Sequence, residues 1–135
     1  MDRLLLLTSL LLCQGAACAS SLPVPRTGTP NDQNREYVDV PYPPPAARVE
    51  IVPPCPERGA VWVDGEWSWK GKRWAWEPGG WVLVPQKDAY FTPWTIAVRP
   101  EDGTMRFWPG SWHAPDGARL PKPRILLGAT TSGQP

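Results

Sequence analysis

Apolar and polar residues alternate along residues 60–84, and tryptophan takes most of the large apolar positions. Side chains two positions apart share one face of a strand, so this alternation predicts short β-strands. The phrase W-x-x-G-x-W occurs twice in the segment, and such a repeat predicts a repeated structural unit. The repeat positions are Trp62, Gly65 and Trp67 in the first copy, Trp76, Gly79 and Trp81 in the second, and Phe107, Gly110 and Trp112 in a degenerate third copy.

Each repeat is predicted to be a β-hairpin that turns at its glycine. Asp64-Gly65 between two β-prone runs favours a type I′ turn, and Pro78-Gly79 favours a type II turn. In both turns, and at the equivalent Gly110, the glycine is expected at positive φ. A further tight turn at Gly71-Lys72 completes a meander of four antiparallel strands.

The predicted register gathers the tryptophans on one face of this meander. The opposite face carries valines and charged residues, and it places Glu66 directly opposite Glu77. The tryptophan face consists of a row with Trp62, Trp67, Trp76 and Trp81 and a second row with Ala60, Trp69, Trp74 and Leu83. Trp67 and Trp76 form the central pair, so they are expected to be the most buried.

A second apolar sheet is predicted over residues 94–112. Pairing Arg99 with Thr104 around the turn at Pro100-Glu-Asp-Gly103 places large apolar side chains on one side. These side chains are Trp94, Ile96, Val98, Met105, Phe107 and Trp112. Two sheets with one apolar face each bury those faces against each other. The predicted fold class is therefore all-β: a small antiparallel meander of tryptophan-rich β-hairpins, either as two short packed sheets or as one coiled sheet.

The N-terminus has the features of an export signal. Arg3 precedes an apolar run from Leu4 to Leu12, which has the length of a signal-peptide core and is shorter than the ~20 residues of a membrane helix. Gly15-Ala-Ala-Cys18 is similar to a bacterial lipoprotein box, in which Cys18 becomes the lipidated first residue. Cleavage after Ala19 fits as well and would release a soluble protein. Both alternatives predict export, and the first adds a membrane anchor.

Proline separates the predicted repeat domain from the N-terminus. Residues 20–58 hold ten of the nineteen prolines, which favours an extended polyproline II segment that acts as a spacer. The predicted organisation is a signal peptide at 1–17, a disordered proline-rich linker at 18–58, the tryptophan-repeat β domain at 59–113 and a disordered tail at 114–135.

On these motifs the chain resembles the bacterial W-x-x-G-x-W (also written Y-x-W-G-x-W) repeat proteins. The resemblance covers about Arg48 to Trp112, and the third copy departs from the pattern with Phe107 in place of tryptophan. Those proteins are small, exported and often lipidated, with a proline-rich segment before tandem tryptophan hairpins. The resemblance implies a cell-envelope protein, here an outer-membrane-anchored lipoprotein, and supplies no activity.

The sequence offers little chemistry for catalysis. It has one histidine, His113, which is expected to be a solvated turn residue, and it lacks a metal-spaced Cys/His cluster, a nucleophile elbow and a phosphate-binding loop. No catalytic residue, cofactor or metal site is predicted. Glu66 and Glu77 on a flat sheet are not expected to serve glycoside hydrolysis, which needs a cleft. The net charge of +1 argues against nucleic acid as a partner.

Two non-enzymatic roles remain. In the first, the domain is a structural or interaction module that a lipid anchor and a proline-rich stalk display in the envelope. In the second, exposed tryptophans stack on the sugar rings of an envelope polysaccharide or peptidoglycan. This glycan platform would consist of Trp67, Trp69, Trp74 and Trp76, whose solvent exposure discriminates between the two roles. The structural or interaction role is the favoured interpretation, and the sequence identifies neither the protein partner nor the glycan.

Overall fold

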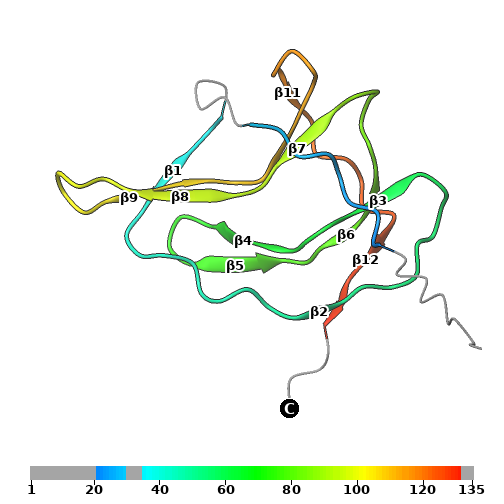
Figure 1. The fold of residues 1–135 in the computed structure, drawn as a ribbon. Coiled ribbons are helices and arrows are strands. Elements are labelled where there is room, and N and C mark those ends of the chain that lie inside the picture. The colour runs from blue at the N-terminus through cyan, green and yellow to red at the C-terminus, as the bar shows by residue number, and fades with distance from the viewer. Residues whose placement is uncertain (1–20, 30–34, 132–135) are drawn as a thin grey trace, which may run out of the picture.

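The computed structural model describes residues 21–29 and 35–131, and this part of the chain is all-β, as predicted (Figure 1). Its strands pair in an antiparallel manner and form small sheets of two or three strands. The strands are β1 (Val38–Val40), β2 (Glu50–Ile51), β3 (Ala60–Val63), β4 (Glu66–Trp69), β5 (Trp74–Glu77), β6 (Gly80–Leu83), β7 (Tyr90–Thr92), β8 (Thr95–Val98), β9 (Met105–Trp108), β10 (Ser111–His113), β11 (Arg119–Leu120), β12 (Leu127–Gly128) and β13 (Thr130–Thr131). No described segment is a helix long and apolar enough to cross a bilayer.

The first two repeats form one long hairpin, called hairpin A here, over residues 60–83. β3 pairs with β6, which places Trp62 opposite Trp81, and β4 pairs with β5, which places Trp67 opposite Trp76. The predicted pairing of Trp67 with Trp76 is confirmed. The predicted pairings of Trp62 with Trp67 and of Trp76 with Trp81 are wrong, because each W-x-x-G-x-W phrase is a single bent strand.

The tryptophan contacts give a physical reason for this arrangement. A long hairpin lets every repeat tryptophan meet another one edge to face across the strands, and such pairs contribute about 0.5–1.5 kcal/mol beyond burial. The ring centroids are 5.6 Å apart for Trp62 and Trp81 and 5.3 Å apart for Trp67 and Trp76. The turn is therefore at the tip, where Lys70 N–H donates to Arg73 O at 2.9 Å and Gly71 has the expected positive φ of 83°.

The third repeat belongs to a second bent hairpin, hairpin B, over residues 90–113. β7 pairs with β10 and β8 pairs with β9, so that Phe91 lies opposite Trp112 and Ile96 lies opposite Phe107. At its tip Arg99 N–H donates to the Thr104 carbonyl at 2.8 Å, as predicted. Phe107 and Trp112 thus take the places that Trp76 and Trp81 have in hairpin A.

The core lies between the hairpins and under the segments that cross them. Phe107 is completely buried and meets Trp74 edge to face, with ring centroids 4.9 Å apart. A second cluster joins Val82 of hairpin A to Trp112 of hairpin B. The contact of Trp74 with Phe107 agrees with the predicted packing of the tryptophan face on the second sheet. Val82 lies on the opposite face of hairpin A, so its packing on Trp112 was not predicted, and Val98 remains exposed near the tip of hairpin B.

The segments on either side of the hairpins pack against them. β1 extends the sheet of hairpin B through β9, β2 pairs with β13, and β11 and β12 join the sheets of β10 and β6. Residues 21–29 also attach, since Trp62 N–H donates to Pro23 O at 2.8 Å. The predictions of a free linker at 18–58 and a free tail at 114–135 are therefore wrong for the described residues. Sheet edges and indole N–H groups need hydrogen-bond partners, and these segments supply them.

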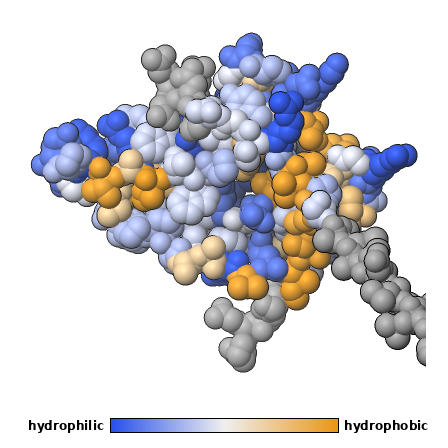
Figure 2. Space-filling view, in the orientation of Figure 1, coloured by the Kyte–Doolittle hydropathy of each residue, from blue (hydrophilic) through white to orange (hydrophobic). Residues whose placement is uncertain are grey.

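The surface is uneven in polarity. Figure 2 shows apolar side chains gathered on the side where β3, β6 and β12 lie, while the tip of hairpin B is polar. Leu83 of β6 and Leu127 of β12 are among the exposed apolar residues. Residues 1–20, with the predicted signal peptide and Cys18, lie outside the described part of the chain.

Candidate functional site

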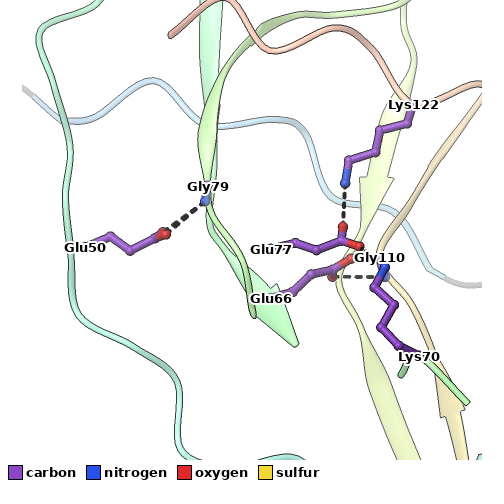
Figure 3. A network of polar contacts seen from close by, with 7 residues as sticks. All are labelled: Glu50, Glu66, Lys70, Glu77, Gly79, Gly110 and Lys122. Carbon is purple, nitrogen blue, oxygen red and sulfur yellow. Dashed lines mark hydrogen bonds and ion pairs between the residues drawn. The ribbon is translucent and has the colours of Figure 1, made fainter. Parts of the chain in front are cut away.

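The bend of hairpin A is held by the carboxylate of Glu50, which comes from β2. Gly65 N–H donates to Oε2 at 3.1 Å, and Gly79 N–H donates to Oε1 at 3.0 Å and to Oε2 at 3.1 Å. The indole N–H of Trp76 also donates to Oε1, at 3.0 Å. Figure 3 shows Glu50 reaching Gly79 from the side of the strand opposite to Glu66 and Glu77. One carboxylate thus satisfies donors from both repeats.

The repeat glycines are required for close approach rather than for positive φ. Positive φ in the described chain occurs at other glycines, among them Gly71. A Cβ atom on Gly79 would lie 2.6 Å from Val63 O and 2.7 Å from Gly65 N, and one on Gly65 would lie 2.5 Å from the Trp76 ring. The predicted positive φ at Gly65, Gly79 and Gly110 is therefore wrong, and a side chain at the bend would push the two strands apart.

The bend of hairpin B is held in a related way by two charged side chains. Gly110 N–H donates to Glu66 Oε2 at 3.1 Å, which links hairpin B to hairpin A (Figure 3). Arg35, which is buried, donates to the carbonyl oxygens of Pro93 at 3.1 Å and of Pro109 at 3.4 Å. Each bend therefore has a carboxylate that accepts from its glycine.

A cavity of about 220 Å³ lies between the two hairpins at these bends. Its polar wall comes from the face of β4 and β5 opposite the tryptophans, and its apolar wall comes from β7 and β10. The lining includes Glu66, Ser68 and Glu77 on the polar wall, Phe91 and Trp112 on the apolar wall, and Lys122 from the C-terminal segment. The cavity therefore combines charged and aromatic side chains on facing walls.

The two glutamates of the cavity have opposite electrostatic environments. Glu77 accepts from Lys70 Nζ at 2.8 Å and from Lys122 Nζ at 2.9 Å, and these bonds lower the pKa of Glu77 to about 2. Burial raises the pKa of Glu66 above its ordinary value of 4.5, although the Gly110 N–H and Lys122 oppose the shift. The strand register that sets these two carboxylates opposite each other was predicted correctly. Lys70 and Lys122 relieve the repulsion that the register would otherwise create.

Replacing Glu66 with Gln is expected to stabilise the protein at pH 7. Because the folded-state pKa of Glu66 is raised, its stabilising contribution is full below pH 4.5 and is lost as the pH rises through the folded-state pKa. Gln accepts the Gly110 N–H without carrying a buried charge. The advantage of the variant in urea unfolding should shrink as the pH falls toward 4.5. A variant that is less stable than wild type at pH 7 would contradict the desolvation of Glu66.

The proposed glycan platform is largely covered. Trp74 is buried, and Trp67, Trp69 and Trp76 are half-buried. The proline-rich segment crosses this face: Trp67 Nε1–H donates to Ala46 O at 3.0 Å, and Trp74 Nε1–H donates to Tyr42 O at 3.3 Å.

The most buried tryptophans are at the other end of hairpin A. Trp62 and Trp81 are each 2% exposed, and Trp81 Nε1–H donates to Pro53 O at 2.8 Å. The expectation that the central pair, Trp67 and Trp76, would be the most buried is wrong. The segments at residues 53 and 126–129 cover the far end of the face more completely than residues 42–46 cover its centre.

His113 is buried, which corrects the expectation of a solvated turn residue. Its ring is 2% exposed and stacks on Tyr90, with centroids 5.3 Å apart. The Ser111 hydroxyl lies 2.8 Å from Nε2, and Gly117 O lies 3.2 Å from Nδ1. Gly117 O can only accept, so Nδ1 carries the hydrogen of that bond. His113 alternates with Trp112 along β10, which places it on the face away from the apolar wall of the cavity.

Sequence reasoning missed the side chains that hold the bends, namely Glu50 and Arg35, and the cation Lys122. Glu50 lies in an alternating segment in which Val49 and Ile51 are exposed and the glutamate faces the hairpin. Alternation alone predicts the opposite orientation. The sequence signal that could have identified Glu50 is a single carboxylate in an apolar strand, close to a motif rich in N–H donors.

The described residues contain no group of three or more His, Cys, Asp or Glu side chains arranged to hold a metal ion. Comparison of the chain with protein-family models, with curated proteins and with solved structures gave no match.

Proposed function

We propose that the protein is a non-catalytic component of the bacterial cell envelope in which the W-x-x-G-x-W repeats have a structural and interaction role. One observation supports this role above others: the indole N–H groups of all four repeat tryptophans of hairpin A donate to the protein's own chain. Tryptophans that bind an external glycan would keep their faces and N–H groups available. Aromatic burial of this kind also stabilises a small domain that lacks a large aliphatic core.

Replacing Trp67 with Phe tests this role, because phenylalanine keeps a ring for stacking on a sugar and loses the N–H. The expected result is a loss of about 1 kcal/mol in the free energy of unfolding, from the lost bond to Ala46 O. Co-sedimentation with purified peptidoglycan or envelope polysaccharide should not change. Unchanged stability would contradict the structural role of the Trp67 N–H. A Trp67→Ala variant that stays folded and loses sedimentation with the glycan would favour the glycan platform instead.

We also propose export with a lipid anchor on Cys18, supported by the apolar run from Leu4 to Leu12 and by Gly15-Ala-Ala-Cys18. Pro23 is already attached to β3, so Pro23 is only five residue steps from Cys18 along the chain. At ~3.5 Å per step these five steps span at most about 18 Å. The domain would therefore lie close to the membrane surface rather than at the end of a long stalk.

Intact-mass analysis of the native protein checks the anchor. The expected protein lacks residues 1–17 and carries a diacyl or triacyl group on Cys18, since one acyl chain holds a protein only marginally. The Cys18→Ser variant should lack this mass. A mature N-terminus at Ser20 would contradict the anchor and leave export intact.

A further inference from the structure

The cavity between the hairpins has polar groups that the protein itself does not use. Glu66 Oε2 accepts the Gly110 N–H, but within the described residues no hydrogen bond reaches Glu66 Oε1 or the Ser68 hydroxyl. Neither oxygen is among the buried side-chain atoms without a partner, so both are open to the cavity. Glu66 and Ser68 are two residues apart on β4 and therefore share the face that lines it.

The retention of a charge on Glu66 is unfavourable in the free protein. Burial raises its pKa, and Glu77 lies directly opposite on β5. Binding sites commonly keep a charged group that lowers the stability of the fold, at a position where a neutral group would be more stable. The geometry gives this carboxylate a free oxygen aimed at a space that a ligand would fill.

The charges around the cavity nearly balance, with one more negative than positive side chain. The negative side chains are Asp64, Glu66 and Glu77 on the lining and Glu36 bound to Arg119, and the positive ones are Arg119 and Lys122 on the lining and Lys70 bound to Glu77. A strongly cationic or anionic ligand would upset this balance. A neutral ligand with several hydroxyl groups would not.

The size of the cavity and the residues of its apolar wall restrict the class of ligand further. A volume of about 220 Å³ holds about seven waters at ~30 Å³ each, which is below the range of pockets for drug-sized ligands. Facing the polar wall are Phe91 and Trp112, whose rings lie 5.4 Å apart. A ring with hydroxyls at its edge and an apolar face matches both walls.

We propose that this cavity binds one neutral pyranose ring, with Glu66 and Ser68 accepting and donating hydrogen bonds to its hydroxyls and Phe91, which packs on the buried Trp112, covering its apolar face. The ring is either a free sugar or the terminal residue of a glycan. This site differs from the tryptophan face, which the proline-rich segment covers. It goes beyond the proposed function, because neither the lipid anchor nor the structural role of the repeats depends on it.

The test is a titration of the full mature protein, followed by amide and indole resonances in ¹H–¹⁵N spectra. The probes are glucose, galactose, mannose and N-acetylglucosamine, with glycerol and ethanolamine as acyclic neutral and cationic comparisons. The expected result is a saturable shift of the Gly110 amide and the Trp112 indole with at least one of the four sugars. A methyl glycoside that binds as well as the free sugar indicates a glycan terminus, and exclusive binding of the free sugar indicates the monosaccharide.

Variants link the shift to the cavity. Glu66→Gln is expected to weaken binding by about 10-fold or more, as for loss of a charge-assisted hydrogen bond. The variant keeps the Gly110 bond, and its spectrum checks that it is folded. Ser68→Ala should weaken binding by a smaller factor, and Trp94→Ala, which changes an exposed indole elsewhere, should leave it unchanged. The proposal is overturned if no sugar gives a saturable shift, if Glu66→Gln binds like wild type, or if ethanolamine binds this site more tightly than every sugar.

Discussion

Replacement of Glu50 with Ala is expected to lower the free energy of unfolding by about 4 kcal/mol, which would leave a domain of this size largely unfolded. The carboxylate accepts from Gly65, Gly79 and Trp76, so its removal leaves three N–H donors at a closely packed bend without their partner. Hydrogen bonds to a charged group contribute about 1.5–3 kcal/mol each, and water at a half-buried site recovers part of that loss.

Urea unfolding followed by tryptophan fluorescence measures this effect. Glu50→Gln should lie between wild type and Glu50→Ala, because one amide oxygen still accepts while the NH₂ group meets N–H donors. Glu101→Ala, at the exposed tip of hairpin B, is the matched control and should change little. A loss below about 1 kcal/mol for Glu50→Ala would show that the carboxylate does not hold the bend.

Replacement of Trp81 with Ala is expected to cost about 3–5 kcal/mol. Trp81 is almost completely buried, meets Trp62 edge to face, and donates its indole N–H to Pro53 O. The variant therefore loses a large core side chain, an aromatic pair and the bond that holds the proline-rich segment on β6.

Trp94→Ala is the control, because it removes the same type of side chain from an exposed position. Trp94 is 39% exposed and has a ring contact with Phe107. Its loss should be well below that of Trp81→Ala. Circular dichroism and thermal unfolding of both variants check the difference. Equal losses would mean that the burial of the repeat tryptophans is not what stabilises the domain. Tryptophan content as such would then account for the stability.

The sequence was sufficient for the parts of the fold that depend on local alternation. Strand type, the tips at Gly71 and Gly103, and the pairing of Trp67 with Trp76 all follow from side-chain period and turn chemistry. The separation of a tryptophan face from a face with valines and glutamates follows from the same period.

The sequence did not reveal where each repeat turns. An Asp-Gly pair between β-prone residues fits a tight turn as well as a bend, and the choice depends on a partner far away in the chain. Gly65 and Gly79 approach each other because Glu50 supplies an acceptor for both N–H groups. Local propensity carries no information on such a contact.

The proline-rich segment was misjudged for a related reason. Its composition predicts an extended chain, and residues 42–54 are indeed mostly outside regular strands. Proline lacks an N–H but keeps its carbonyl, so an extended proline-rich chain offers free acceptors along its length. The indole N–H groups of hairpin A provide the donors, as the bonds of Trp67 and Trp81 illustrate.

The candidate cavity also depends on contacts between distant segments. Glu66 and Glu77 were recognised as neighbours from the register, but the apolar wall comes from hairpin B and Lys122 comes from the supposed tail. A flat sheet has no cleft, and it was the packing of the second hairpin that created one.

Hydrogen exchange of the indole N–H groups, measured on the ¹⁵N-labelled mature protein, tests most directly whether the tryptophan repeat is an internal structure closed by the proline-rich segment. The indoles of Trp74 and Trp81, bonded to Tyr42 O and Pro53 O, are expected to exchange much more slowly than that of the exposed Trp94. Equally fast exchange of all three, in a protein whose backbone amides in hairpin A remain protected, would contradict the account and leave the tryptophan face open to a ligand.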